Sequence, residues 1–269
     1  MFRVVSIARN TFKEVVREPV YYVLVTVACL MIVLARLMPL FTITEDIKMM
    51  KDIGLSTVNI TALLITILAA SRVVYGEIES RTAFTVVAKP VRRSQFILGK
   101  YFGILAAAVV AIVVVGLVFT AMIWWQTLDQ PIPEAQQVQR QVQGMIGVAE
   151  GCLLSVFQVM VLAAISVAAS IYATMVVNVG ICFSLFLLGN LTGWFIDHAL
   201  PDATRAPVGH ALVGALLGLL PLLETYNVQA LGVGTRVPVA ALATAFAYAA
   251  YYSAAALVIA IALFHRREL

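Results

Sequence analysis

Charged side chains are scarce in this sequence. They make up 12% of the 269 residues, whereas 62% are hydrophobic, and the mean hydropathy is +0.98. Soluble globular proteins carry about 25% charged residues, so this composition excludes a soluble core and indicates an integral membrane protein. From residue 151 to residue 196 there is no charge at all. A chain of this length suits one all-α bundle of about six spanning helices at roughly 20 residues each.

Motifs of catalytic and metal-binding residues are also missing from this sequence. No G-x-x-x-x-G-K-[S/T] loop that could cradle phosphates is present, so we expect the chain itself not to hydrolyse ATP. No H-E-x-x-H occurs, and the scattered His198, His210 and His265 lack metal-ligand spacing. The three cysteines lie inside apolar runs and are interpreted as packing residues. They are Cys29, Cys152 and Cys182. We therefore expect no catalytic residue and no metal site.

Apolar runs predict a single transmembrane domain, 1–269, with six spans. These spans are 19–41, 53–75, 96–125, 151–176, 180–196 and 237–264. A short turn at residues 178–180 would make the fourth and fifth spans antiparallel neighbours. Segments 42–52 and 126–150 are predicted to be external loops, the second of them with a short helix over 133–147.

Prolines and glycines interrupt segment 197–236, which precedes the last span. Its apolar core, 206–223, is barely long enough to cross a membrane. If it did cross, the charged chain end His-Arg-Arg-Glu-Leu would lie outside, against the positive-inside tendency. We therefore predict that this segment is external, either re-entrant or an interfacial helical pair.

Residues 1–18 predict an amphipathic helix at the membrane surface. One face would carry the apolar residues Val5, Ala8, Phe12, Val15 and Val16. The rest is occupied by charged and mostly basic side chains, Arg3, Arg9, Lys13, Glu14 and Arg17, so the helix could lie in the interface plane and meet anionic headgroups. A plain solvated start of the chain is the alternative, and such an amphipathic start is not expected to be a cleavable signal peptide.

The basic residues gather at the predicted membrane boundaries. The net charge is +4 and the pI is about 9.0, values that could suggest a nucleic-acid partner. Placement at the boundaries is better explained by orientation, because short loops rich in Lys and Arg stay in the cytoplasm. We expect a multi-pass protein of the plasma (inner) membrane, with both termini and loop 76–95 in the cytoplasm and no nucleic-acid partner.

Loop 76–95 itself is predicted to contain a helix. Acidic residues begin the stretch 77–88 and basic residues follow it, as the helix dipole favours. Pro90 would end this helix, and Ser94 would cap the next one.

This loop also carries the main motifs of a family resemblance. The motifs are Glu79-Ser80-Arg81-Thr82, Lys89-Pro90-Val91-Arg92-Arg93 and Leu98-Gly99-Lys100. Two more lie at 220–228 (Leu-Pro-Leu-Leu-Glu-Thr-Tyr-Asn-Val) and 264–269 (Phe-His-Arg-Arg-Glu-Leu). Together they resemble the membrane-spanning permease subunits of type-2 ABC exporters, although Arg81 stands where many members have glycine.

The resemblance implies a fold, partners and a site. The fold has an N-terminal elbow helix, here 1–18, and a cytoplasmic coupling helix, here 77–89, that docks on a separate ATPase dimer. That partner would bind ATP and Mg, and this chain no cofactor, while a second permease copy, most simply an identical one, would complete the transporter. The residues expected to contact the ATPase are Glu77, Glu79, Arg81, Thr82, Lys89 and Arg92.

Three functions are compatible with these residues. The first is the permease of an ABC exporter, with a hydrophobic or lipid-like substrate favoured by the nearly charge-free spans. The second is a mechanical transmitter of the same architecture that acts on an extracytoplasmic partner through segments 126–150 and 197–236. The third is an ion-coupled transporter or channel, which predicts ionisable residues deep in the spans.

Overall fold

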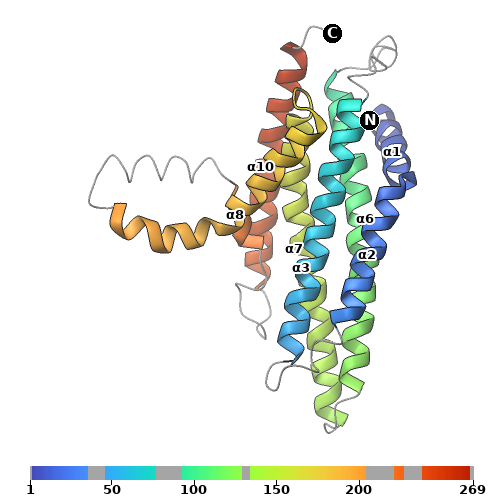
Figure 1. The fold of residues 1–269 in the computed structure, drawn as a ribbon, viewed down its shortest axis with the longest axis vertical. Helices are drawn as coiled ribbons and strands as arrows, with labels where there is room; N and C mark the ends of the chain where they lie inside the picture. The colour runs from blue at the N-terminus through green and yellow to red at the C-terminus, as the bar shows by residue number, and fades with distance from the viewer. Residues whose placement is uncertain are drawn as a thin grey trace.

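The computed structural model describes residues 2–35, 46–76, 93–128, 134–203, 221–226 and 238–266. Within these residues every element is helical, as the sequence predicts. The long helices lie side by side in one elongated bundle (Figure 1). Both ends of the described chain lie at the same end of this bundle, which we call the terminal end (Figure 1).

Five helices are long and apolar enough to cross a membrane, and a bent pair brings the number to six. The five are α3 (Asp46–Ala70), α6 (Arg93–Leu128), α7 (Glu134–Ala169), α8 (Met175–Ala203) and α10 (Val239–Arg266). The pair consists of α1 (Phe2–Arg17) and α2 (Pro19–Ala35), which meet at an angle of 64°. Two short elements complete the order: a π-helical turn, η2 (Ser71–Tyr75), and a 3-10 turn, η3 (Leu223–Tyr226). This architecture fits a multi-pass membrane protein.

Two segments predicted as external loops are largely helical. Residues 46–52 belong to α3, and residues 134–150 form the first part of α7 without a break. The short helix predicted over 133–147 is present, but it continues into the next span: Gln141, Gly144 and Val148 of this part of α7 are buried at spacings of three and four. A Cβ on Gly144 would come within 3.0 Å of Ile123 in α6, so this face packs on the neighbouring helix. Packing of one face stabilises this first part of α7 as a continuation of the span and not as a separate helix in a loop.

The turn between α7 and α8 lies earlier than predicted. Helix α7 ends at Ala169 and α8 begins at Met175, so residues 178–180 are inside a helix. The reason is tertiary: the Asn178 side chain is fully buried and bonds to hydroxyls of two other helices. These bonds outweigh the preference of an Asn-x-Gly sequence for a turn. Helix α8 also continues to Ala203, beyond the predicted end at 196, and its last part points away from the bundle (Figure 1).

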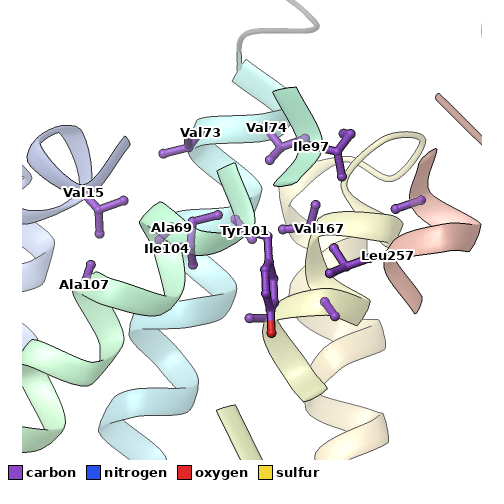
Figure 2. Close-up of a cluster of buried hydrophobic side chains, with 14 of the residues drawn as sticks. Val15, Ala69, Val73, Val74, Ile97, Tyr101, Ile104, Ala107, Val167 and Leu257 are labelled. Carbon is purple, nitrogen blue, oxygen red and sulfur yellow. The ribbon is translucent and has the colours of Figure 1, made fainter. Parts of the chain in front are cut away.

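Three clusters of buried apolar side chains hold the bundle together. The one nearest the terminal end joins α1, α2, α3, η2, α6, α7 and α10, and Figure 2 shows its centre around Tyr101. Many of its members are alanine or valine, which let helix backbones approach closely. In lipid the hydrophobic effect does not drive helices together, so this close van der Waals packing is what holds them.

The short turn η3 packs against the bundle through two of its four residues. Leu223 and Tyr226 are 0% and 2% exposed, and they pack with side chains from α3, α7, α8 and α10. Gly189 of α8 is required here, because a Cβ on it would come within 2.7 Å of the Pro221 carbonyl oxygen. Of the predicted external segment 197–236, the structure packs residues 221–226 against the bundle with Pro221, Leu223 and Tyr226 buried, and it describes 197–203 as the end of α8.

Candidate functional site

The predicted coupling residues lie outside the described part of the chain. All six fall in segment 77–92: Glu77, Glu79, Arg81, Thr82, Lys89 and Arg92. The structure does describe what this segment joins, namely η2 before it and the first turns of α6 after it. Val74 of η2 and Ile97 of α6 belong to one buried cluster and lie close together in Figure 2. The two ends of the segment are thus neighbours at the terminal end.

A buried polar cluster around Asn178 holds η2, the turn that leads into segment 77–92. Its side-chain Nδ2 donates to Ser71 Oγ at 2.7 Å and to Ser166 Oγ at 3.0 Å. Ser71 Oγ in turn donates to the Ile67 carbonyl at 2.8 Å, and the Cys182 thiol lies 3.5 Å from Asn178 Oδ1. This Asn178 cluster ties η2 to α7 and α8. Hydrogen bonds between membrane helices contribute about 0.6 kcal/mol each on average.

The next residue, Arg72, ties the same turn to the bend between α1 and α2. Its Nη1 donates to Glu18 Oε2 at 2.8 Å. The side chains are 41% and 29% exposed, so the ion pair contributes no more than about 1 kcal/mol. The ion pair matters because of where it lies: it joins the bend between α1 and α2 to the last helical turn before segment 77–92.

The first turns of α6 are held against α1 by two glycines. A Cβ on Gly99 would come within 2.6 Å of Ile7 Cγ2, and a Cβ on Gly103 within 2.6 Å of Thr11 Cβ. Glycines four apart form a groove that lets another helix approach closely. Lys100 lies between them, is 2% exposed, and pairs with Glu14 at 3.7 Å. The Leu-Gly-Lys motif thus has a structural explanation in the docking of α1.

The buried face of α1 agrees with the predicted apolar face except at Val5, since Val15 is buried and Phe12 and Val16 pack against the buried cluster at the terminal end. Thr11 and Val15 are buried and Ile7 is half-buried, whereas Val5 is 65% exposed. The reason is the helix on which α1 packs. Because α1 buries its apolar face against α6, the groove at Gly99 and Gly103 determines which α1 residues are buried. The predicted location of α1 in the plane of the membrane interface is not tested by these contacts.

Arg93 joins the beginning of α6 to the end of α10. Its Nη1 donates to the carbonyl oxygens of Phe264 and His265, at 3.2 Å each. The last carbonyls of a helix lack partners within the helix and carry partial negative charge, so a guanidinium there is stabilising. The Phe264 ring stacks on Phe96 with centroids 5.8 Å apart and lies 5.9 Å from the Arg93 guanidinium carbon. Helix α6 begins at Arg93, so Arg93 is not part of the predicted loop and Ser94 lies within the helix and not at its cap.

Taken together, the described contacts connect both ends of segment 77–92 to five other helices, α1, α2, α7, α8 and α10. The exit turn η2 contacts α8 and the α1–α2 bend, and the first turns of α6 contact α1 and α10. Among the described residues no group of His, Cys, Asp and Glu could hold a metal ion. The chain matches no known protein family and no curated protein.

Proposed function

We propose that this chain is the membrane-spanning permease subunit of an ABC exporter. Segment 77–92 would receive the motion of a separate ATPase, and the bundle would move a hydrophobic or lipid-like substrate across the membrane. The observation that carries the proposal is the anchoring of this segment at both ends by specific polar contacts. The resemblance of the motifs around it supplies the identity of the partner.

The contacts suggest how motion would pass through the bundle. ATP and Mg bind to the partner, whose closure pushes on Glu77, Glu79, Arg81, Thr82, Lys89 and Arg92. A displacement of the segment then pulls on α10 through Arg93 and on α8 through Ser71 and Asn178. It also pulls on the α1–α2 bend through Arg72. Packed helices move as rigid bodies, so small shifts at one end become rearrangements of the whole bundle.

The finer features of the fold have roles in this proposal. Helix α1 is the elbow helix, docked on α6, and residues 221–226 are the inner part of a re-entrant segment. The terminal end of the bundle faces the cytoplasm, so that both termini and the ATPase are on the same side of the plasma membrane. A second copy of the chain completes the transporter, and the chain itself binds no nucleotide.

Co-purification tests this proposal. The chain is expressed with the ATPase encoded beside its gene, as wild type and as a Glu79→Lys, Arg81→Glu double variant. We expect the wild type to retain the ATPase and the double variant to lose it, because two charges at the contact are reversed. Gln143→Lys, exposed on α7 at the opposite end of the bundle, is the matched control and should retain it. Failure of the wild type to bind the ATPase in any detergent or lipid would contradict the assignment.

A mechanical transmitter is the second candidate, and a feature of the α6–α7 pair favours it. Both helices have 36 residues and are thus about 54 Å long, well beyond the roughly 30 Å hydrocarbon core of a bilayer. Near their far end Val138, Val142 and Met145 are exposed at spacings of four and three. An exposed apolar stripe on a helix that projects from the membrane fits a protein partner. Val142→Lys would then abolish function while leaving ATPase binding intact, whereas an exporter would tolerate it.

A further inference from the structure

Residues 221–226, which include η3, are bonded to α10. The Leu222 backbone N–H donates to the Tyr248 hydroxyl at 3.1 Å, and the Tyr226 hydroxyl donates to the Ala245 carbonyl oxygen at 3.5 Å. The rings of Tyr226 and Tyr248 also pack together, with their centroids 6.4 Å apart. We call these six residues the η3 segment. Its hydrogen bonds attach it to the first half of α10.

The η3 segment also packs closely on α8, at Gly189. A Cβ added to Gly189 would lie 2.7 Å from the Pro221 carbonyl oxygen and 2.8 Å from Leu223 Cγ. Little of α8 is covered elsewhere, because 22% of its apolar stretch is buried, against 50–61% in the stretches of α3, α6 and α7. Among the described elements, η3 makes the most extensive contact with α8. The η3 segment therefore joins α8 to α10.

At the terminal end, the same two helices are held by the two ends of segment 77–92. Asn178 of α8 bonds to Ser71, which lies in the turn that leads into the segment. Arg93, the residue that follows the segment, bonds to the carbonyl oxygens of Phe264 and its neighbour at the end of α10. One end of the segment thus holds α8, and the other end holds α10.

Both helices then lead from the terminal end to the η3 segment. At 1.5 Å per residue, Gly189 lies about 16 Å along α8 from Asn178, and Tyr248 lies about 24 Å along α10 from Phe264. Helices move as rigid bodies, so a shift of α8 relative to α10 at the terminal end also changes their positions at the η3 segment. The hydrogen bonds keep the η3 segment on α10. The contact that separates is therefore the one at Gly189.

We propose that the η3 segment is a gate in the path of the transported substrate. In this structure α8 closes on the gate at Gly189. When segment 77–92 moves, α8 separates from the η3 segment, which stays on α10, and the path opens beside Leu223. This inference rests on the proposed function, because the motion of the ATPase drives the gate. It adds the place at which that motion opens the bundle.

The reactivity of position 223 measures whether the gate is closed. Leu223 is 0% exposed, so the thiol of a Leu223→Cys variant should react slowly with N-ethylmaleimide. Mass spectrometry of the peptide that contains residue 223 measures this rate separately from labelling of the native cysteines. A buried group reacts at a rate set by the population of the open form. Opening of the gate therefore appears as faster labelling, whichever substrate is transported.

A methyl group at Gly189 tests the contact with α8 in the purified Leu223→Cys chain, without any ATPase. Gly189→Ala places its Cβ against the Pro221 carbonyl oxygen and should raise the labelling rate at least about fivefold. Gly180→Ala is the matched control on the same helix, since a Cβ there meets no atom within 4 Å and labelling should not change. Equal labelling of the two variants would overturn the proposal.

A second variant tests the contact with α10 and adds no bulk to the bundle. Tyr248→Phe removes the hydroxyl that accepts from Leu222, so the labelling rate of Leu223→Cys should rise about threefold. Tyr251→Phe is the matched control, because the Tyr251 side chain is 76% exposed. Unchanged labelling in Tyr248→Phe would show that this bond does not hold the η3 segment, and the proposal would fail.

The ATPase encoded beside the gene tests what drives the gate. With this ATPase bound, ATP should raise labelling of Leu223→Cys severalfold over ADP. Asn178→Leu or Arg93→Gln should abolish the rise while the ATPase still co-purifies, because each releases one of the two helices from segment 77–92. ATP turnover with unchanged labelling would overturn the gate and leave the permease assignment standing. Failure of the chain to bind the ATPase would instead overturn the proposed function, and with it the drive of the gate.

Discussion

Replacing Gly103 by alanine tests the docking of α1 on α6 with a single methyl group. The new Cβ would lie 2.7 Å from the Ala8 carbonyl oxygen and 2.6 Å from Thr11 Cβ. The carbonyl belongs to the backbone, so it can move away only if the whole of α1 moves. Overpacking of this kind costs about 1–3 kcal/mol, while alanine regains about 1 kcal/mol of helix propensity over glycine.

Gly147→Ala in α7 isolates the overpacking cost. No atom lies within 4 Å of a Cβ built there, so this variant has the gain in propensity without the clash. The difference between the two variants is then the overpacking cost alone, about 1–3 kcal/mol. At about 2–4 °C per kcal/mol for a large domain, the Gly103 variant should melt about 2–12 °C below the Gly147 variant.

The assay is thermal unfolding of both variants in the same detergent, followed by size-exclusion chromatography of the heated samples. Leucine at the same positions should widen the gap, because Gly103 has no room for a longer side chain and Gly147 has open space. If Gly103→Ala melts at the temperature of Gly147→Ala or above it, α1 does not pack in the glycine groove and the explanation of the Leu-Gly-Lys motif is wrong.

Three further predictions concern the contacts around segment 77–92. Asn178→Leu keeps the branched shape of the side chain, with a larger volume, but removes two interhelical hydrogen bonds, so thermal stability in detergent should fall by at least about 1 kcal/mol, whereas an unchanged midpoint would contradict the buried cluster. Arg93→Gln removes the guanidinium from the α10 carbonyls; we expect the ATPase still to co-purify while ATP-driven transport in vesicles falls severalfold, and full transport would refute the proposed link to α10. Glu14→Gln leaves the buried Lys100 ammonium without its carboxylate and should cost about 1–3 kcal/mol of stability, while Lys100→Met should be nearly neutral; equal melting of these two variants would argue against the ion pair.

The sequence predicts the class of fold and most of the spans, because long apolar runs have few alternatives in a membrane. The expected all-α protein with about six spans is confirmed in that five to six helices are long and apolar enough. The helix that follows Pro19 and the helix that ends near Phe264 lie close to their predicted positions. The elbow, coupling and re-entrant roles stay proposals.

Helix ends and contacts between helices were less predictable. The Asn178 side chain finds hydroxyl partners 107 and 12 residues away along the chain, so no local pattern could show that it lies in a helix. The predicted apolar face of α1 was wrong at Val5 for a similar reason, because a groove on another helix determines which residues of α1 are buried. A cue was nevertheless present at the site: Gly99 and Gly103 are four apart, the spacing of closely packed membrane helices.

The π-helical turn at Ser71–Tyr75 has a consequence for the direction in which the chain leaves the bundle. A π-turn contains one more residue than an α-turn in the same stretch of helix. If the same five residues formed an ordinary α-helix, the extra residue would rotate everything that follows by about 100° about the helix axis. Residues 77–92 would then face a different neighbour, although none of their own side chains had changed. The direction in which this segment leaves the bundle is therefore set by the π-helical conformation of residues 71–75.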